Sequence, residues 1–127
     1  MFEKYALKWT PVWLAVGWLL VTTVIVLSLI RLGVEMPGQQ SDKLGHFLAY
    51  GTLMFWFAQI YRIARTRLVI AVGLALMGVA LEIAQGFTGY RSFEYADMAA
   101  NSVGVVAGWL LAPPRTANLL LFAERWT

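Results

Sequence analysis

Four apolar stretches, each close to the length of a membrane-spanning helix, alternate with short polar segments along the chain. The first, residues 11–30, has 20 residues and no charged side chain. That is enough for an α-helix to cross a hydrocarbon core of about 30 Å. The others are residues 44–61, 68–87 and 95–112, and the segments between them contain proline, glycine or clustered charges, as is typical of helix ends. The pattern predicts an all-α, integral membrane four-helix bundle that forms a single domain over residues 1–127.

The composition favours a membrane protein whose main partner is the lipid bilayer. Hydrophobic residues make up 60% of the 127 residues and charged residues only 13%. Four spans of about 20 residues each use most of the chain, so any function must lie in the bundle or its loops. The net charge of +3 does not indicate a nucleic-acid partner, because the basic residues are scattered at helix ends, where a membrane accounts for them. The absence of cysteine excludes disulfides and thiolate chemistry.

The basic residues are divided unequally between the two sides of the predicted bundle. Arg31, Lys43 and Arg91 lie on one side. The other side holds both termini and the second loop, and it has seven of the ten basic residues: Lys4, Lys8, Arg62, Arg65, Arg67, Arg115 and Arg125. Because cytoplasmic loops carry the excess of lysine and arginine, both termini are predicted to be cytoplasmic.

This orientation brings the unusual polar residues of the spans toward the outer side of the membrane. Within each span they recur at i, i+3 or i+4 spacing, which puts them on one helix face: Asp42, His46 and Tyr50 in the second span, Glu82 and Gln85 in the third, Asp97 and Asn101 in the fourth. At a rise of about 1.5 Å per residue, Tyr50, Glu82 and Asn101 lie roughly 8 to 10 Å from their helix ends. Lipid would not tolerate such a layer unless the helices turned it inward. We therefore expect these side chains to meet.

Two further groups of residues have structural interpretations. Gly104 and Gly108 form a small-x-x-x-small pattern, which permits close helix contact. Arg62, Arg65 and Arg67 of the second loop are interpreted as topology signals.

The segments DKLGHFLAYGTL and LEIAQGFTGYRSFEYADMAANSVGVVAG, in this order, resemble the VanZ-like family of small bacterial membrane proteins. The resemblance covers residues 41–112 and rests on D-K-x-x-H-x-x-x-Y, E-x-x-Q, a loop arginine and D-x-x-x-N-x-x-G. The family is named for an accessory protein of teicoplanin resistance, so the resemblance implies a bacterial inner-membrane protein with a role at the cell envelope. The matching positions are Asp42, Lys43, His46, Tyr50, Glu82, Gln85, Arg91, Asp97, Asn101 and Gly104.

The residue types favour an enzyme that acts on the polar head of a lipid-linked or anionic envelope intermediate. His46, the only histidine, is the natural general acid or base, since histidine exchanges protons near neutral pH. Glu82, in low-dielectric surroundings, is a candidate proton donor, and Arg91 is a candidate ligand for a phosphate or carboxylate. Asp97 completes the candidate catalytic set. Asp42 either orients the imidazole or caps the second helix. Phosphoryl transfer and hydrolysis both fit these residues.

A divalent cation is an alternative occupant of the site. Its candidate ligands are Asp42, His46, Glu82 and Asp97, and the oxygen-rich set suits Mg²⁺ or Mn²⁺ better than Zn²⁺.

A third hypothesis is a non-catalytic binding or interaction module whose polar cluster is structural. Arg91 would then pair with Glu82 or Asp97. Tyr50, Gln85 and Asn101 are assigned a supporting role, in which they hydrogen-bond between helices. Such bonds contribute only about 0.6 to 2 kcal/mol each in membranes, a modest reason to bury several acids. The sequence leaves the oligomeric state open.

Overall fold

The computed structural model describes residues 3–29, 39–87 and 95–126, and the regular secondary structure within these ranges is helical apart from one isolated bridge between Lys4 and Tyr61. The helices are α1 (Thr10–Leu29), α2 (Gln39–Ile60), α3 (Ala64–Phe87), α4 (Tyr95–Leu110) and α5 (Leu119–Glu124). The prediction of an all-α chain is confirmed. The four long helices begin and end within a few residues of the predicted spans, except that α2 and α3 begin several residues earlier.

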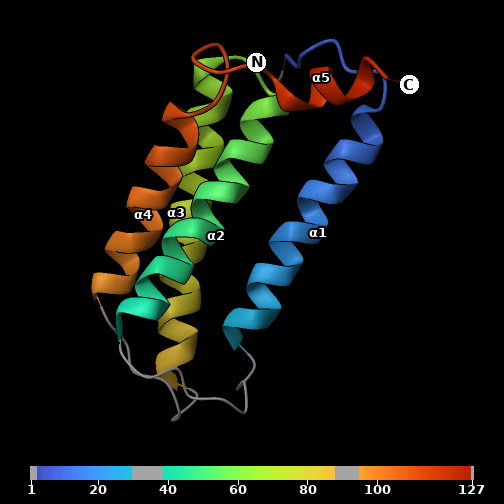
Figure 1. Ribbon diagram of the computed structural model, residues 1–127. Coiled ribbons are helices and arrows are strands. Elements are labelled where there is room, and N and C mark those ends of the chain that lie inside the picture. The colour runs from blue at the N-terminus through green and yellow to red at the C-terminus, as the bar shows by residue number, and fades with distance from the viewer. Residues whose placement is uncertain (1–2, 30–38, 88–94, 127) are drawn as a thin grey trace.

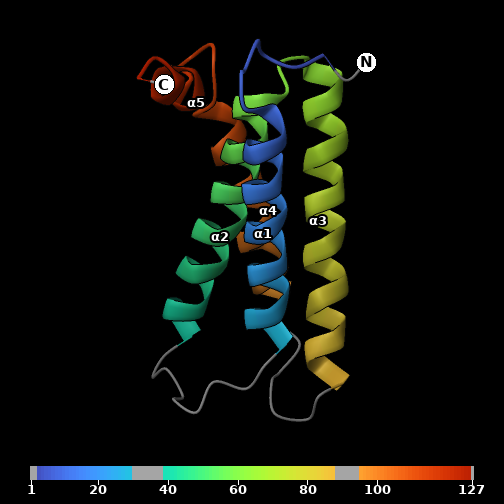
Figure 2. The same ribbon diagram turned by 90° about the vertical axis from the view of Figure 1, so that its right-hand side faces the viewer.

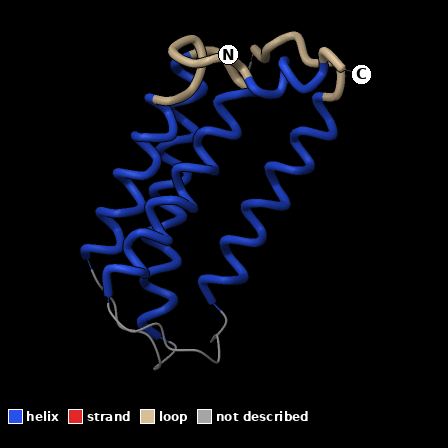
Figure 3. The backbone as a smooth tube through the Cα atoms, in the orientation of Figure 1, coloured by secondary structure: helices blue, strands red, loops and turns tan. Residues whose placement is uncertain are grey.

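The four long helices run alternately up and down, and both termini lie at the same end of the molecule (Figure 1). In the described part of the chain the loops and the short α5 gather at that end, which we call the terminal end (Figure 3). A view turned by 90° shows that α1 to α4 run roughly along one common direction (Figure 2). The N-terminal ends of α2 and α4 and the C-terminal end of α3 therefore share the opposite end, which we call the site end.

The core is built around α2, which contacts α1, α3, α4 and α5. Tyr50, Leu53, Met54, Phe57 and Ala58 of this helix are all buried. Their spacing of three or four residues lines one broad helical face. A central helix that is covered on several sides explains how polar residues in α2 avoid the outer surface.

The outer surface of the bundle is strongly apolar. Trp18, Leu19, Leu76 and Val103 are each more than half exposed, and about half of the large apolar side chains of α1 are exposed. Two helical segments, Thr10–Leu29 and Ala64–Ala84, are long and apolar enough to cross a membrane by length and composition. An apolar exterior around buried polar side chains is the arrangement that a lipid environment stabilises.

Glycines bring the backbones of α2 and α4 into direct contact. A Cβ atom added at Gly104 would collide with the carbonyl oxygen of Phe47, and one added at Gly108 would collide with that of Gly51. The colliding atoms belong to the backbone and cannot rotate away. The predicted close contact through Gly104 and Gly108 is confirmed, and it holds α2 and α4 in one register.

Arg67 has a structural role that its interpretation as a topology signal did not anticipate. Its side chain is only 3% exposed. The guanidinium donates to the carbonyl oxygens of Ala58 at 2.7 Å, Tyr61 at 2.9 Å and Pro113 at 2.6 Å, and to the Tyr5 hydroxyl at 3.2 Å. Carbonyl groups at a helix C-terminus lack partners within the helix, so a buried arginine satisfies them at the end of α2.

Glu124 fastens α5 to the start of α1. Its carboxylate accepts hydrogen bonds from the amide of Lys8 at 2.6 Å, the amide of Trp9 at 2.9 Å and the indole of Trp13 at 2.6 Å. Burial alone would raise the pKa of this carboxyl. The three hydrogen bonds and the charge of Lys8 nevertheless bring the pKa below its ordinary value of 4.5. A carboxylate from the last helix thus caps the N-terminus of the first.

Replacing Gly108 by alanine is expected to separate α2 from α4 and lower the thermal midpoint. Overpacking of a tight contact costs typically about 1 to 3 kcal/mol. The matched control is Gly73→Ala in α3, where an added Cβ meets no atom within 4 Å. Thermal unfolding of both variants in one detergent checks this. Equal midpoints for Gly108→Ala and Gly73→Ala would contradict the backbone contact.

Candidate functional site

Three titratable side chains from three helices converge at the site end. The donor atoms of His46 from α2, Glu82 from α3 and Asp97 from α4 all lie within 4.8 Å of one another. Glu82 is 1% exposed and Asp97 6% exposed, while His46 is half-buried. The expectation that these three residues meet is confirmed, although 36 residues separate His46 from Glu82 in the sequence.

The helix contacts explain why these side chains meet. His46 directly precedes Phe47, whose backbone lies against Gly104 of α4. On the other side, Gly78 of α3 leaves room for the amide of Asn101, because a Cβ at Gly78 would lie 2.7 Å from the Asn101 Nδ2 atom. Two glycine contacts therefore hold α2 and α3 against α4 close to the converging side chains.

Tyr50 and Asn101 extend the polar layer within the bundle. Each is 2% exposed. Tyr50 follows His46 by one helical turn and interacts electrostatically with Glu82. Asn101 follows Asp97 by one turn, and its Oδ1 atom accepts no hydrogen bond from the residues that the structure describes. Of the polar residues predicted from helix periodicity, the five whose side chains the structure describes are all buried or half-buried.

The remaining predicted site residues are only partly described. Asp42 lies inside α2, which begins three residues earlier at Gln39, so its interpretation as a helix cap is wrong. The cap position was misplaced because α2 extends into the polar segment that precedes the apolar run. The side chains of Asp42 and Gln85, and the whole of Arg91, lie outside the described residues.

Charge is the dominant physical feature of this cluster. Two carboxylates within 4.8 Å of each other repel when both are ionised. At that separation the repulsion between unit charges is about 3 kcal/mol for an effective dielectric constant of about 20. The repulsion is relieved by a shared proton, by a protonated imidazole or by a metal ion. The site is therefore suited to proton transfer or to cation binding.

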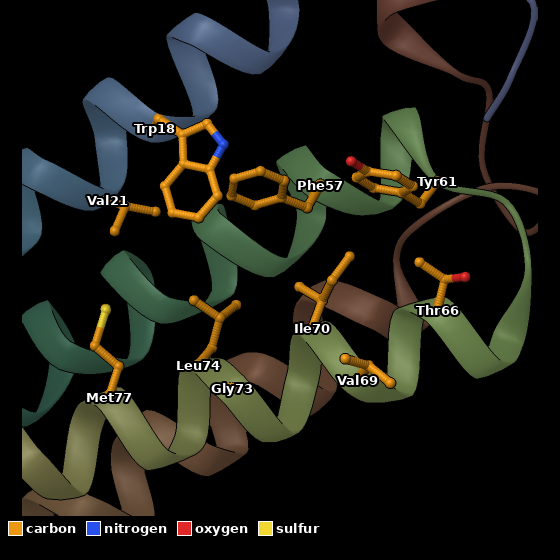
Figure 4. A pocket seen from close by; sticks show the side chains of 10 residues that line it. All are labelled: Trp18, Val21, Phe57, Tyr61, Thr66, Val69, Ile70, Gly73, Leu74 and Met77. Atoms are coloured by element: carbon orange, nitrogen blue, oxygen red, sulfur yellow. The ribbon is translucent and has the colours of Figure 1, made fainter. Parts of the chain in front are cut away.

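A separate cavity between α1, α2 and α3 has a different character. Its volume is about 330 Å³, and its ten lining side chains are shown in Figure 4. Most are hydrocarbon, and Trp18 packs edge-to-face on Phe57 with ring centroids 5.8 Å apart. The polar groups among the lining side chains are the hydroxyls of Tyr61 and Thr66 and the indole N–H of Trp18. None of the five polar-layer residues lines this cavity, which suits an apolar chain rather than catalysis.

Sequence reasoning missed a second group of buried polar residues, at the terminal end. Gln59, Arg67 and Glu124 are each at most 3% exposed. Like the other two, Gln59 uses a backbone partner, because its Oε1 accepts from the amide of Leu119 at 2.7 Å. Every residue type has backbone carbonyl and, except proline, amide groups. The sequence therefore gave no signal that these side chains would bond to them. These contacts join chain segments that are far apart in the sequence.

Comparison with protein families agrees with the motifs. The family model described as VanZ/LLP1 matches residues 4–122. The chain belongs to the VanZ-like family. The match extends beyond the motif region 41–112 to include α1 and the beginning of α5. No curated protein and no solved structure shows significant similarity to this VanZ-like chain.

Proposed function

We propose that this VanZ-like chain is a four-span protein of the bacterial inner membrane. Its polar site faces the extracytoplasmic side, where it binds and acts on the anionic head of a lipid-linked cell-envelope intermediate. The observation that supports this most strongly is the convergence of His46, Glu82 and Asp97 in one buried layer. We extend the proposal to a contribution to glycopeptide (teicoplanin) resistance, which the family relationship supports.

The way the helices pack supports the proposed four-span arrangement. α1 and α3 expose broad apolar surfaces, and α2 lies among the other helices. The 16 residues of α4 rise only about 24 Å, less than a hydrocarbon core of about 30 Å. Its first turn, with Asp97, therefore lies near one membrane boundary. There the polar head of a lipid can reach the site while its chains stay in the bilayer.

Charge supports the proposed orientation. Arg62, Arg65, Arg115 and Arg125 are exposed at the terminal end. Because lysine and arginine accumulate on the cytoplasmic side, the terminal end is cytoplasmic and the site end faces outward. The site is then available to intermediates presented at the outer leaflet.

The site residues favour chemistry over a purely structural network. Neutral polar groups would form a structural network at a lower cost in free energy, because ionisable groups inside a membrane carry a large desolvation cost. His46 supplies the acid or base, and the two carboxylates hold a proton or a cation near the head of the substrate. A binding module without catalysis remains the alternative, distinguished by saturable binding without release of product.

Binding of a prenyl pyrophosphate tests the proposed ligand class. Farnesyl pyrophosphate, with Mg²⁺ and Mn²⁺ in the buffer, is expected to raise the thermal midpoint of the detergent-solubilised protein, because a ligand that binds the folded state stabilises it. Farnesol, the same chain without the anionic head, is the matched control and should give no comparable shift. Release of inorganic phosphate identifies catalysis. Equal shifts with the two compounds would contradict the proposal.

Single introduced cysteines test the orientation. Because the chain itself has no cysteine, no other residue of the protein contributes thiol labelling. Phe87 is 86% exposed at the site end and Trp126 is 80% exposed at the terminal end. A membrane-impermeant maleimide added to intact cells is expected to label Phe87→Cys and to label Trp126→Cys only after permeabilisation. The opposite pattern would overturn the outward-facing site.

A further inference from the structure

We propose that His46, Glu82 and Asp97 together bind one divalent transition-metal ion such as Mn²⁺ or Zn²⁺. Their donor atoms already lie within 4.8 Å of one another. Metal ligands lie about 2.0 to 2.2 Å from the ion, so small side-chain rotations suffice to bring all three to a common centre. Three protein ligands are also the number that catalytic metal sites commonly use, with the remaining positions left to water or substrate.

The donor set selects the class of metal. Imidazole nitrogen suits transition metals, whereas Mg²⁺ and Ca²⁺ prefer ligand sets made of oxygen. One nitrogen and two carboxylate oxygens therefore favour Mn²⁺ or Zn²⁺ over Mg²⁺. This differs from the expectation from sequence, which favoured Mg²⁺ or Mn²⁺ over Zn²⁺ because it counted Asp42 as a further oxygen ligand.

Charge and burial agree with a cation at this position. Glu82 and Asp97 are almost fully buried, and buried carboxylates are stable when paired or when they coordinate a metal. A divalent ion neutralises both at once.

The buried Oδ1 atom of Asn101 is an independent observation. It lies one turn along α4 from Asp97 and accepts no hydrogen bond from the described part of the chain. A buried acceptor of this kind calls for a donor. Water carried by the proposed metal ion would supply one.

The role of this ion rests on the proposed function, whereas its binding does not. Two ionised carboxylates would repel an anionic lipid head. With a divalent cation between them, the same site attracts phosphate oxygens to the open coordination positions. The ion thus accounts for an acid-rich site in a protein proposed to bind an anion.

Mn²⁺ binding to the purified full chain tests the inference, because His46 is the only histidine. The protein is prepared in detergent with a histidine-free affinity tag, stripped with EDTA and titrated with Mn²⁺. Electron paramagnetic resonance should show saturable binding of one ion per chain, and pulsed spectra should show coupling to an imidazole nitrogen. His46→Gln should abolish that coupling, and Glu82→Gln should weaken binding by about tenfold or more.

Glu3→Gln is the matched control, because it removes an exposed carboxylate at the terminal end. It should leave Mn²⁺ binding unchanged. If a site variant fails to fold, the imidazole coupling in the wild-type spectrum still shows whether His46 binds the ion. Absence of saturable binding, or binding without imidazole coupling, would overturn the inference. Mn²⁺ binding without recognition of farnesyl pyrophosphate would overturn the proposed function and leave the metal site standing. The reverse result would overturn the metal site alone.

Discussion

The direct backbone contact between α2 and α4 determines the geometry of the site end. Gly104 leaves no room for a side chain against Phe47, so the two helices meet at a fixed register. His46 directly precedes that contact on α2, and Asp97 lies two turns before Gly104 on α4. A larger residue at the contact would move one group away from the other. The chemistry at the site end therefore depends on glycines that have no functional groups of their own.

The two ends of the bundle use buried polar residues for different purposes. At the terminal end, Arg67 and Glu124 bond mainly to backbone groups. Arg67 ties the start of α3 to the end of α2 and to Pro113, and Glu124 holds α5 against the start of α1. At the site end, His46, Glu82 and Asp97 face one another. The first arrangement satisfies polar groups, whereas the second concentrates charge. Repulsion between the carboxylates at the site end lowers the stability of the fold. We place the function there because that loss of stability has no structural benefit.

Hydropathy and helix periodicity predicted most of the fold and the central part of the site. The apolar runs marked the four long helices. Helix spacing and alternating helix direction gathered the polar residues at the outer side, with Tyr50, Glu82 and Asn101 at one depth, and the structure brings His46, Glu82 and Asp97 together there. The cap assigned to Asp42 was wrong because hydropathy marks the part of a helix that faces lipid, while α2 continues into the polar segment before it. The roles of Arg67 and Glu124 could not be predicted, since their partners are mostly backbone atoms. The family match adds α1 to the region shared with other VanZ-like proteins.

The most direct test of the account is the thermal midpoint of metal-free Glu82→Gln and Asp97→Asn beside wild type in one detergent. Both changes keep the shape of the side chain and remove its charge. If the carboxylates are held together for function, at a cost to stability, the variants should melt at the same temperature as wild type or higher. A fall of several degrees in either variant would mean that its charge belongs to a stabilising network, since breaking a buried pair is costly, and would contradict the central claim.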